Sequence, residues 1–497
     1  MTRNVLFITL DQFRADCLSC AGHPFVRTPA LDELASAGVR FARHYSQASP
    51  CAPGRASLYT GTYQMNHRVV ANGTPLDARF DNIALAAARA GHAPVLLGYT
   101  DQTLDPRLTT GPGDPALSDY EGVLPGFDCV LDLSADHGPW IDRLRSAGHR
   151  VEDVRHALVT EGERDESLSV SAFLTDRAIE WIGGRGDDGW FAHLSYLRPH
   201  PPYAAAGRFS RMYDPADTGS PVPPVDEPNE FHALMLSLDG TKAPQDPAGL
   251  GRMRAQYFGM VSEVDSQLGR LWAFLRDSGQ WDETVIVVTA DHAELLGDHG
   301  LREKVGYWET SQHTVCIVRD PRHPAAHGTV VDRFTENVDI MPTLCEAMGI
   351  PVPHQCDGMP LTPFLRGEEP PWWRTAAHWE YDWRFALIEL GARSEWPWAR
   401  TLERQNLCVR RTEDTAYVHF GDGTHLCFDL AADPTWRTEC TDPGRVMRAA
   451  QEMLTWRQQM LGREHTGFLA QDGGKGRWPA GVPWHAGAGE GQSDQRS

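Results

Sequence analysis

Cys51-Ala-Pro-Gly-Arg-Ala-Ser-Leu-Tyr-Thr-Gly61 is the stretch from which the rest of the chain can be interpreted. It follows Ser49 and Pro50, and its own Pro53 and Gly54 predict a turn that holds the cysteine in front of a helix N-terminus. The first turn of a helix offers free backbone N–H groups and a partial positive charge, which suit an anion or a nucleophile that attacks one. For an isolated cysteine, a buried apolar role is the more frequent alternative.

Two short apolar runs, 5–10 and 284–289, read as fully buried parallel strands with acidic residues at their ends. Because the carboxyl ends of parallel strands meet at one edge of an open α/β sheet, these side chains can converge although they are far apart in the sequence. An isolated strand-end carboxylate is more often a helix cap or a hydrogen-bond partner, so the prediction depends on the whole group. The expected ligands of one divalent cation are Asp11, Gln12, Cys51, Asp291 and His292.

Strands and helices alternate along most of the chain, which predicts an α/β fold: a doubly wound, mainly parallel or mixed central sheet flanked by helices. The remaining strands are expected at 93–99 and 190–196, and the helices at 31–37, 82–90, 169–181 and 253–278. Residues 103–167 are rich in Gly, Pro and Asp and are interpreted as loops and insertions. Residues 204–248 have a similar composition and are interpreted as a lid or an oligomer contact.

The composition changes again towards the C-terminus. Short strands at 407–410, 416–420 and 425–428, followed by a helix at 446–461, predict a smaller antiparallel α+β subdomain. We therefore expect a catalytic domain over 1–375, this subdomain over 376–470 and a loosely ordered tail over 471–497.

The composition also limits the partners and the compartment. A formal charge of -21 without a run of Lys and Arg argues against nucleic acid or an anionic membrane as partner. The 10 cysteines of this 497-residue chain are scattered, so we expect them to be reduced and the protein to be cytoplasmic. No secretory signal and no apolar run long enough to cross a bilayer is recognised.

The pattern Cys51-x-Pro53-x-Arg55, closed by Thr60-Gly61, resembles the signature of the sulfatases, in which a maturase oxidises the cysteine to formylglycine. The segments at 4–12, 198–202 and 289–292 resemble the alkaline phosphatase superfamily, and within it the phosphonate monoester hydrolase and arylsulfatase group. The resemblance covers about residues 1–385 and implies an alkaline phosphatase-like fold. It also implies a formylglycine derived from Cys51, whose hydrated aldehyde attacks the ester with one hydroxyl and expels the esterified group with the other.

The resemblance assigns roles to further residues. Arg55 is expected to contact the formylglycine and the anion, Lys304 to neutralise non-bridging oxygens, and His200 to act as general acid. Residues implied in substrate binding are Asn72, Tyr99 and Asp101, of which Asp101 stands where close relatives carry Thr. Glu294 and His299 are expected to support the site or the fold.

The metal is expected to differ from that of many sulfatases. The position that resembles His292 is often Asn in that family, and the one that resembles Gln12 is often Asp. Imidazole in place of an amide favours manganese, zinc or iron over calcium, and we expect Mn²⁺.

The charges of the site favour a monoanionic ester. Asp11 and Asp291 balance one divalent ion, and Arg55 and Lys304 leave a net positive pocket. Sulfate monoesters, phosphate diesters and phosphonate monoesters all carry a single negative charge. The likeness to the phosphonate monoester hydrolase group around 65–68, 98–107 and His200 implies hydrolysis of phosphonate monoesters and phosphate diesters, with sulfate esters as additional substrates. A homo-oligomer (dimer or tetramer) is also expected. The alternatives are an arylsulfatase and, more remotely, a non-catalytic anion- or metal-binding protein.

Overall fold

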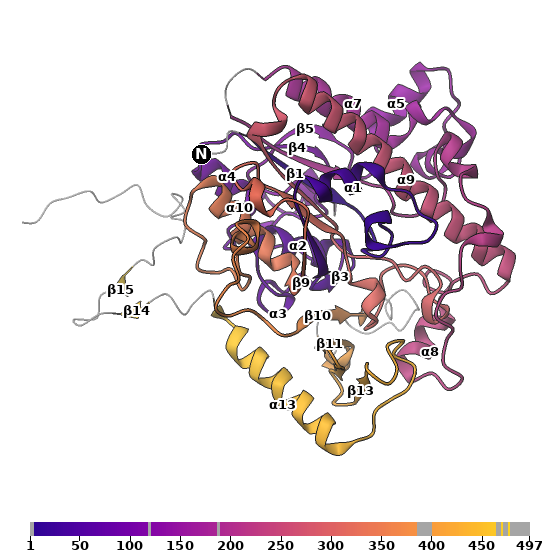
Figure 1. Cartoon of the computed structure of the whole chain (residues 1–497), viewed down its shortest axis with the longest axis vertical. Coiled ribbons are helices and arrows are strands. Elements are labelled where there is room, and N and C mark those ends of the chain that lie inside the picture. The colour runs from indigo at the N-terminus through magenta and orange to yellow at the C-terminus, as the bar shows by residue number, and fades with distance from the viewer. Residues whose placement is uncertain are drawn as a thin grey trace, which may run out of the picture.

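A computed structural model describes residues 4–117, 121–185, 189–384 and 400–463, together with the pairs 469–470 and 476–477. Its largest element is an eight-stranded sheet in the order β5-β4-β6-β1-β7-β8-β2-β9 (Figure 1). In that order the strands are β5 (Asp128–Asp132), β4 (Val95–Gly98), β6 (Phe191–Tyr196), β1 (Asn4–Leu10), β7 (Thr284–Thr289), β8 (Cys316–Arg319), β2 (Val39–Tyr45) and β9 (Thr329–Glu336).

The strand directions make this a mixed sheet. β1 is parallel to both of its neighbours, β6 and β7, and β4 is parallel to β5 and β6. β8 runs antiparallel to β7 and β2, whereas β2 and β9 are parallel. All seven residues of β1 are buried, because helices cover both faces of the sheet. The predicted α/β fold with a mainly parallel or mixed sheet is confirmed.

Alternate side chains of β1 enter the two helical layers. Leu6, Ile8 and Leu10 pack with helices of one face, and Val5 and Phe7 with helices of the other. The first layer contains α1 (Pro29–Ser36), α5 (Gly138–Ser146), α6 (Val154–Val159), α7 (Val170–Gly183) and α9 (Pro247–Asp277). The second contains α2 (Cys51–Thr60), α4 (Ile83–Arg89), α10 (Ile340–Met348) and α11 (Thr362–Leu365).

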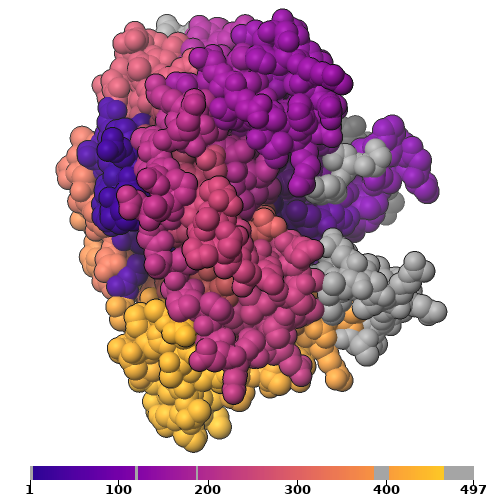
Figure 2. All heavy atoms as spheres, turned by 90° about the vertical axis from the view of Figure 1, so that its right-hand side faces the viewer, coloured from indigo at the N-terminus to yellow at the C-terminus, as the bar shows by residue number. Residues whose placement is uncertain are grey.

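A second sheet occupies the C-terminal part, which forms the lower, yellow end of the molecule in Figure 2. Its strands, in order, are β13 (His425–Asp429), β12 (Thr415–Phe420), β11 (Asn406–Arg411), β10 (Ala377–Asp382) and β3 (Ala48–Ser49). β10 to β13 are antiparallel, and α13 (Pro443–Met460) packs on them through Met453 and Trp456. β3 pairs in parallel with β10 and comes from the segment that leads into α2, so the small sheet directly supports the start of α2.

Several elements differ from the sequence-based expectation. The interpretation of 103–167 as loops and insertions is wrong in part, because β5, α5 and α6 lie there. β2, β8 and β9 were not expected, since they are short or mix apolar and charged residues. Further short elements are α3 (Gln64–His67), α8 (Glu230–Ser237), β14 (Leu469–Ala470) and β15 (Gly476–Arg477). Apart from 476–477, the expected tail over 471–497 lies outside the described residues.

Within the described ranges, no helix combines the length and the apolar character needed to cross a membrane.

Candidate metal and nucleophile site

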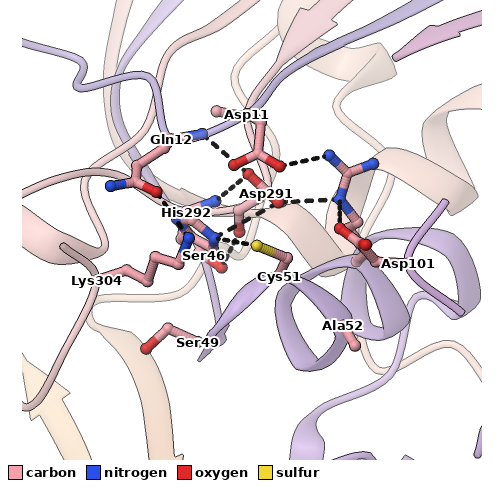
Figure 3. A network of polar contacts seen from close by, with 12 residues as sticks. Asp11, Gln12, Ser46, Ser49, Cys51, Ala52, Asp101, Asp291, His292 and Lys304 are labelled. Atoms are coloured by element: carbon pink, nitrogen blue, oxygen red, sulfur yellow. Dashed lines mark hydrogen bonds and ion pairs between the residues drawn. The ribbon is translucent and has the colours of Figure 1, made fainter. Parts of the chain in front are cut away.

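The carboxyl ends of β1 and β7 bring two acidic residues together. These strands are parallel neighbours, so Asp11 and Asp291 leave the sheet at the same edge. Both carboxylates are buried. Figure 3 shows them next to each other, with Cys51 and His292 beside them. In the part of the chain that the structure describes, one ligand atom from each of these four residues lies within 4.8 Å of the others.

Cys51 is the first residue of α2, so the helix N-terminus faces this cluster. Its Sγ atom lies 3.3 Å from Nε2 of His292, and its side chain is buried. In the same helical turn, the N–H of Ala52 donates to Oδ1 of Asn72 over 3.0 Å. The sequence-based placement of Cys51 at a helix N-terminus is therefore correct.

Pro53 and Gly54 do not form the expected turn before the helix but lie inside the first turns of α2. Proline is tolerated there because its missing N–H would have no intrahelical partner. A Cβ atom at position 54 would lie 2.6 Å from the carbonyl oxygen of Asp291 and 2.9 Å from that of Ala48. Glycine at this position therefore lets α2 pack directly against the loop that carries Asp291.

Arg55 joins the acidic residues from the opposite side. Its Nε lies 3.0 Å from Oδ2 of Asp291, and its Nη2 lies 3.0 Å from Oδ2 of Asp11. Nη1 donates to Oγ of Ser195 over 2.8 Å, and Asp101 approaches Nε at 3.3 Å. The guanidinium is fully buried, so its hydrogen bonds position the carboxylates. Contact between Arg55 and the substrate anion stays a prediction.

The cluster fits a divalent cation. Oδ2 of Asp11 accepts hydrogen bonds from Tyr99 and Arg55, whereas its buried Oδ1 has no partner among the described residues. Buried polar atoms normally have partners, and a metal ion would supply one here. Two carboxylates, the Nε2 of His292 and the group at Cys51 form a donor set of the kind that binds manganese, zinc or iron.

The pKa shifts agree with a site that needs a cation. Burial and the neighbouring Asp11 raise the pKa of Asp291. Burial and Lys304 lower the pKa of His292 to about 3, which keeps the imidazole neutral, the form that binds metals. Burial also raises the pKa of the Cys51 thiol, and Asp11 raises it further. Burial away from water disfavours the charged form of each of these three groups, and the neighbouring charge that is named for each adds to the effect.

Gln12 and Lys304 lie together at the edge of the cluster. Nζ of Lys304 donates to Oε1 of Gln12 over 2.8 Å, and the Nε2 of Gln12 is held between the carboxylates of Glu294 and Glu303. Burial opposes the charge of Lys304, but the acidic groups around it, among them Cys51, Glu303 and Asp11, raise its pKa. Lys304 is therefore a cation beside the cluster.

His200 lies in the turn that follows β6. Its Nδ1 is 2.6 Å from the carbonyl oxygen of Pro201, which leaves Nε2 for other contacts. Arg198 holds the turn by donating to the carbonyl oxygens of His200 and Pro202 at 2.8 and 3.1 Å, and by a buried ion pair with Glu161. Burial and then Lys304 lower the pKa of His200, whereas Asp11 raises it. His200 thus lies within electrostatic reach of the cluster.

The three expected substrate-binding residues border the same site. The hydroxyl of Tyr99 donates to Asp11 over 2.6 Å, and the guanidinium of Arg55 lies 4.4 Å from its ring centroid. Asp101 is buried with a left-handed backbone at φ 51°. Asn72 is exposed and binds the first turn of α2. The structure thus brings all the predicted residues to one edge of the sheet, without testing their roles.

Three polar residues of the site were not expected. Ser195 binds Arg55, Ser46 donates to the carbonyl oxygen of Asp291, and Tyr203 donates to the carboxylate of Glu294 over 3.0 Å. Ser195 lies within the buried strand β6, and no local pattern distinguishes it. Tyr203 could have been considered because it follows the turn of His200 directly.

The mixed α/β sheet, with a buried cluster of possible metal ligands and a helix N-terminus at its carboxyl edge, has the fold of the alkaline phosphatase superfamily. The sequence model of the sulfatase family matches residues 3–350. The chain belongs to the sulfatase family.

Relatives resemble almost the whole chain. The multifunctional alkaline phosphatase superfamily protein PehA of Trinickia caryophylli is 35% identical, over 95% of this chain and 99% of that protein. The crystal structure of the phosphonate monoester hydrolase of Agrobacterium radiobacter superposes with a TM-score of 0.86 at 38% identity, over 96% of this chain and 100% of that one. The phosphonate monoester hydrolase SpPMH from Silicibacter pomeroyi gives 0.84 at 33% identity, over 97% and 100%.

Proposed function

We propose that this protein is a metal-dependent hydrolase of phosphonate monoesters and phosphate diesters that uses a formylglycine made from Cys51. The observation that carries the proposal is the full-length likeness to two phosphonate monoester hydrolases, at 38% and 33% identity. The buried cluster of Asp11, Cys51, Asp291 and His292 supports it. We expect sulfate esters to be additional substrates.

Cys51 is poorly suited to act as a thiol. The thiolate is the nucleophilic form of cysteine, and burial followed by Asp11 raises the pKa of this thiol well above its usual value. Formylglycine would supply a geminal diol whose hydroxyl is the nucleophile, and a divalent ion held by Asp11, Asp291 and His292 would polarise that hydroxyl. A formylglycine-generating maturase is therefore the expected partner.

Three further residues would have separate roles in the hydrolysis. Arg55 keeps the carboxylates of Asp11 and Asp291 in place from behind. Lys304, a cation with a raised pKa, would stabilise charge on the non-bridging oxygens. His200 would deliver a proton to the oxygen of the departing alcohol through Nε2 when its ring is protonated on both nitrogens, a form that the neighbouring Asp11 favours, because its Nδ1–H is held by the carbonyl oxygen of Pro201.

The charges favour a monoanionic substrate. Asp11 and Asp291 would balance a divalent ion, and Arg55 is paired with both of them and with Asp101. Lys304, whose Nζ also lies 3.7 Å from Oε2 of Glu303, is then the cation that would attract the negative charge of the ester. A dianionic phosphate monoester is better matched by two metal ions, and the described residues supply one group of metal-binding side chains.

Parallel kinetics would test the proposal. The protein is produced together with a maturase, and kcat/KM is measured on phenylphosphonate esters, phosphate diesters, aryl sulfates and phosphate monoesters. We expect the first two classes to be hydrolysed most efficiently. The Cys51→Ala variant is the control, and its activity should fall by several orders of magnitude.

Two results would contradict the proposal. A higher kcat/KM on aryl sulfates than on both phosphorus esters would identify an arylsulfatase. An intact mass that shows an unmodified Cys51, together with no turnover of any ester, would favour a non-catalytic anion- or metal-binding protein.

A further inference from the structure

Glu294 accepts hydrogen bonds from four different segments around the site. Its Oε1 accepts the backbone N–H groups of Leu296 and Glu303 over 2.8 and 2.6 Å. Its Oε2 accepts the Nε2 of Gln12 and, over 3.0 Å, the hydroxyl of Tyr203. The side chain is fully buried. This acid therefore connects the end of β1, the turn of His200 and both arms of the loop between residues 294 and 303.

The amide of Gln12 has one favourable orientation as a result. Its Nε2 lies between the carboxylates of Glu294 and Glu303, and its Oε1 accepts from the ammonium group of Lys304 over 2.8 Å. A reversed amide would place its oxygen against two carboxylates and its NH₂ group against an ammonium group. Both contacts would be repulsive, because an amide oxygen only accepts and an ammonium group only donates.

The backbone of Gln12 is constrained as well. Its φ of 69° is left-handed, which is uncommon for a residue other than glycine. Its N–H donates to Oδ1 of Asp291 over 3.2 Å, and its carbonyl oxygen accepts from the hydroxyl of Tyr257 over 2.7 Å. Backbone outliers of this kind persist where the surroundings hold them, often at functional sites. The backbone of Gln12 thus binds one member of the metal cluster, while Glu294 holds its side chain.

We infer that Glu294 is a positioning residue for the metal site: it acts through Gln12 and keeps the amide oxygen of Gln12 directed to the side of Lys304 and the cation. The inference rests on the metal site of the proposed function but not on the ester that is cleaved. Residues behind metal ligands typically change metal affinity by about 10- to 100-fold when they are replaced.

The test measures metal binding and not turnover. Metal-free protein is titrated with Mn²⁺ by calorimetry for the wild type, Glu294→Gln, Gln12→Ala and the double variant. Glu294→Gln keeps the shape of the side chain. It replaces one of the two carboxylate oxygens, which together accept from four donors, with an NH₂ group that cannot accept. We expect it to bind Mn²⁺ about 10- to 100-fold more weakly than the wild type.

The double variant separates positioning from a general structural role. If Glu294 acts through Gln12, Gln12→Ala/Glu294→Gln should bind Mn²⁺ no more weakly than Gln12→Ala alone, because the two losses share one cause. Asp265→Asn is the matched control. Asp265 is also a buried acid that accepts two backbone N–H groups, those of Ala30 and Leu31, and its replacement should leave Mn²⁺ affinity unchanged.

Each other outcome overturns the inference. Three outcomes would show that Glu294 has no specific role. Glu294→Gln could bind Mn²⁺ with wild-type affinity, or the losses of affinity from the two single changes could multiply in the double variant. Asp265→Asn could also lose as much Mn²⁺ affinity as Glu294→Gln. If the wild type binds no Mn²⁺, both the proposed metal site and the inference are wrong. Glu294-dependent Mn²⁺ binding in a protein that hydrolyses none of the four ester classes would support the inference and contradict the proposed function.

Discussion

Lys304 and His200 both act electrostatically on Asp11, but they should serve different steps of hydrolysis. Lys304→Ala removes a positioned cation, so it should cost about 3 kcal/mol of transition-state stabilisation. The loss should appear mainly in kcat and be similar for all leaving groups. His200→Ala should harm esters of weakly acidic alcohols most, since these need a proton on the departing oxygen.

A series of aryl esters with graded leaving-group pKa values measures both effects. Lys242→Ala is a suitable control because Lys242 is an exposed lysine outside the site. A steeper leaving-group dependence is expected for His200→Ala, with an unchanged slope for Lys304→Ala. Identical slopes in the two variants would remove the general-acid role from His200.

His292 should decide which metal restores activity. After chelation, Mn²⁺ should reactivate the wild type better than Ca²⁺, because a buried neutral imidazole suits manganese better than calcium. His292→Asn replaces the imidazole with an amide oxygen donor and should shift the preference towards Ca²⁺. Metal content and kcat/KM of the reconstituted proteins provide the measurement. Equal rescue of the wild type by both ions would contradict this role.

At the scale of a single element, α9 carries a buried acid that should make stability depend on pH. Burial and then Glu161 raise the pKa of Glu263 to about 7, although Ser169 and Ser171 donate to its carboxylate. The folded protein therefore holds a proton that the unfolded chain releases at lower pH. Glu263 therefore contributes up to about 3 kcal/mol to the free energy of unfolding. This contribution is fully present below about pH 4.5 and is lost as the pH rises to about 7.

Glu263→Gln should remove this dependence. The free energy of unfolding, measured by urea denaturation at pH 5 and pH 8, should differ less between the two pH values in the variant than in the wild type. Asp176→Asn, at a partly exposed carboxylate on the neighbouring α7 that pairs with Arg270, should keep the wild-type difference. If Glu263→Gln kept the full wild-type difference in the free energy of unfolding between pH 5 and pH 8, the Glu263 carboxyl group would not be the source of this pH dependence.

At the scale of the whole molecule, the two sheets should unfold together. β3 pairs with β10, and the N–H of Glu380 donates to the carbonyl oxygen of Gln47 over 2.9 Å. The carboxylate of Glu380 accepts the N–H of Met65 over 2.7 Å, and Trp379 stacks on Tyr45 at 5.9 Å. These contacts join the C-terminal sheet to the segment that leads into α2.

Differential scanning calorimetry should therefore show one cooperative transition for the full chain. A chain that ends at residue 375 should fail to fold, because it exposes the apolar surface that β10 covers. Near-UV circular dichroism of the truncated chain measures this loss. Two separate transitions, or a folded and active fragment 1–375, would show that the predicted division at 375 separates independent units.

The sequence by itself determined the class of fold and the position of the site. The apolar runs at 5–10 and 284–289 could be recognised as buried strands because continuous apolar segments of this length require cover on both faces. Asp11 and Asp291 follow from them, since the ends of parallel strands meet at one edge. The Cys51 motif is local, and its proline and glycine indicated a helix N-terminus at Cys51, although both residues lie inside the helix and not in the expected turn.

The tertiary structure alone decided how the side chains are used. It directs Arg55 to three carboxylates, and it places Glu294 behind Gln12. It also adds β3 to the sheet of the C-terminal part. Each of these contacts joins segments that are distant in the chain, and each depends on the direction of a side chain or on the pairing of a two-residue strand. Hydrophobic periodicity and motif spacing report only which face of an element is buried, so they carry no information about such partners.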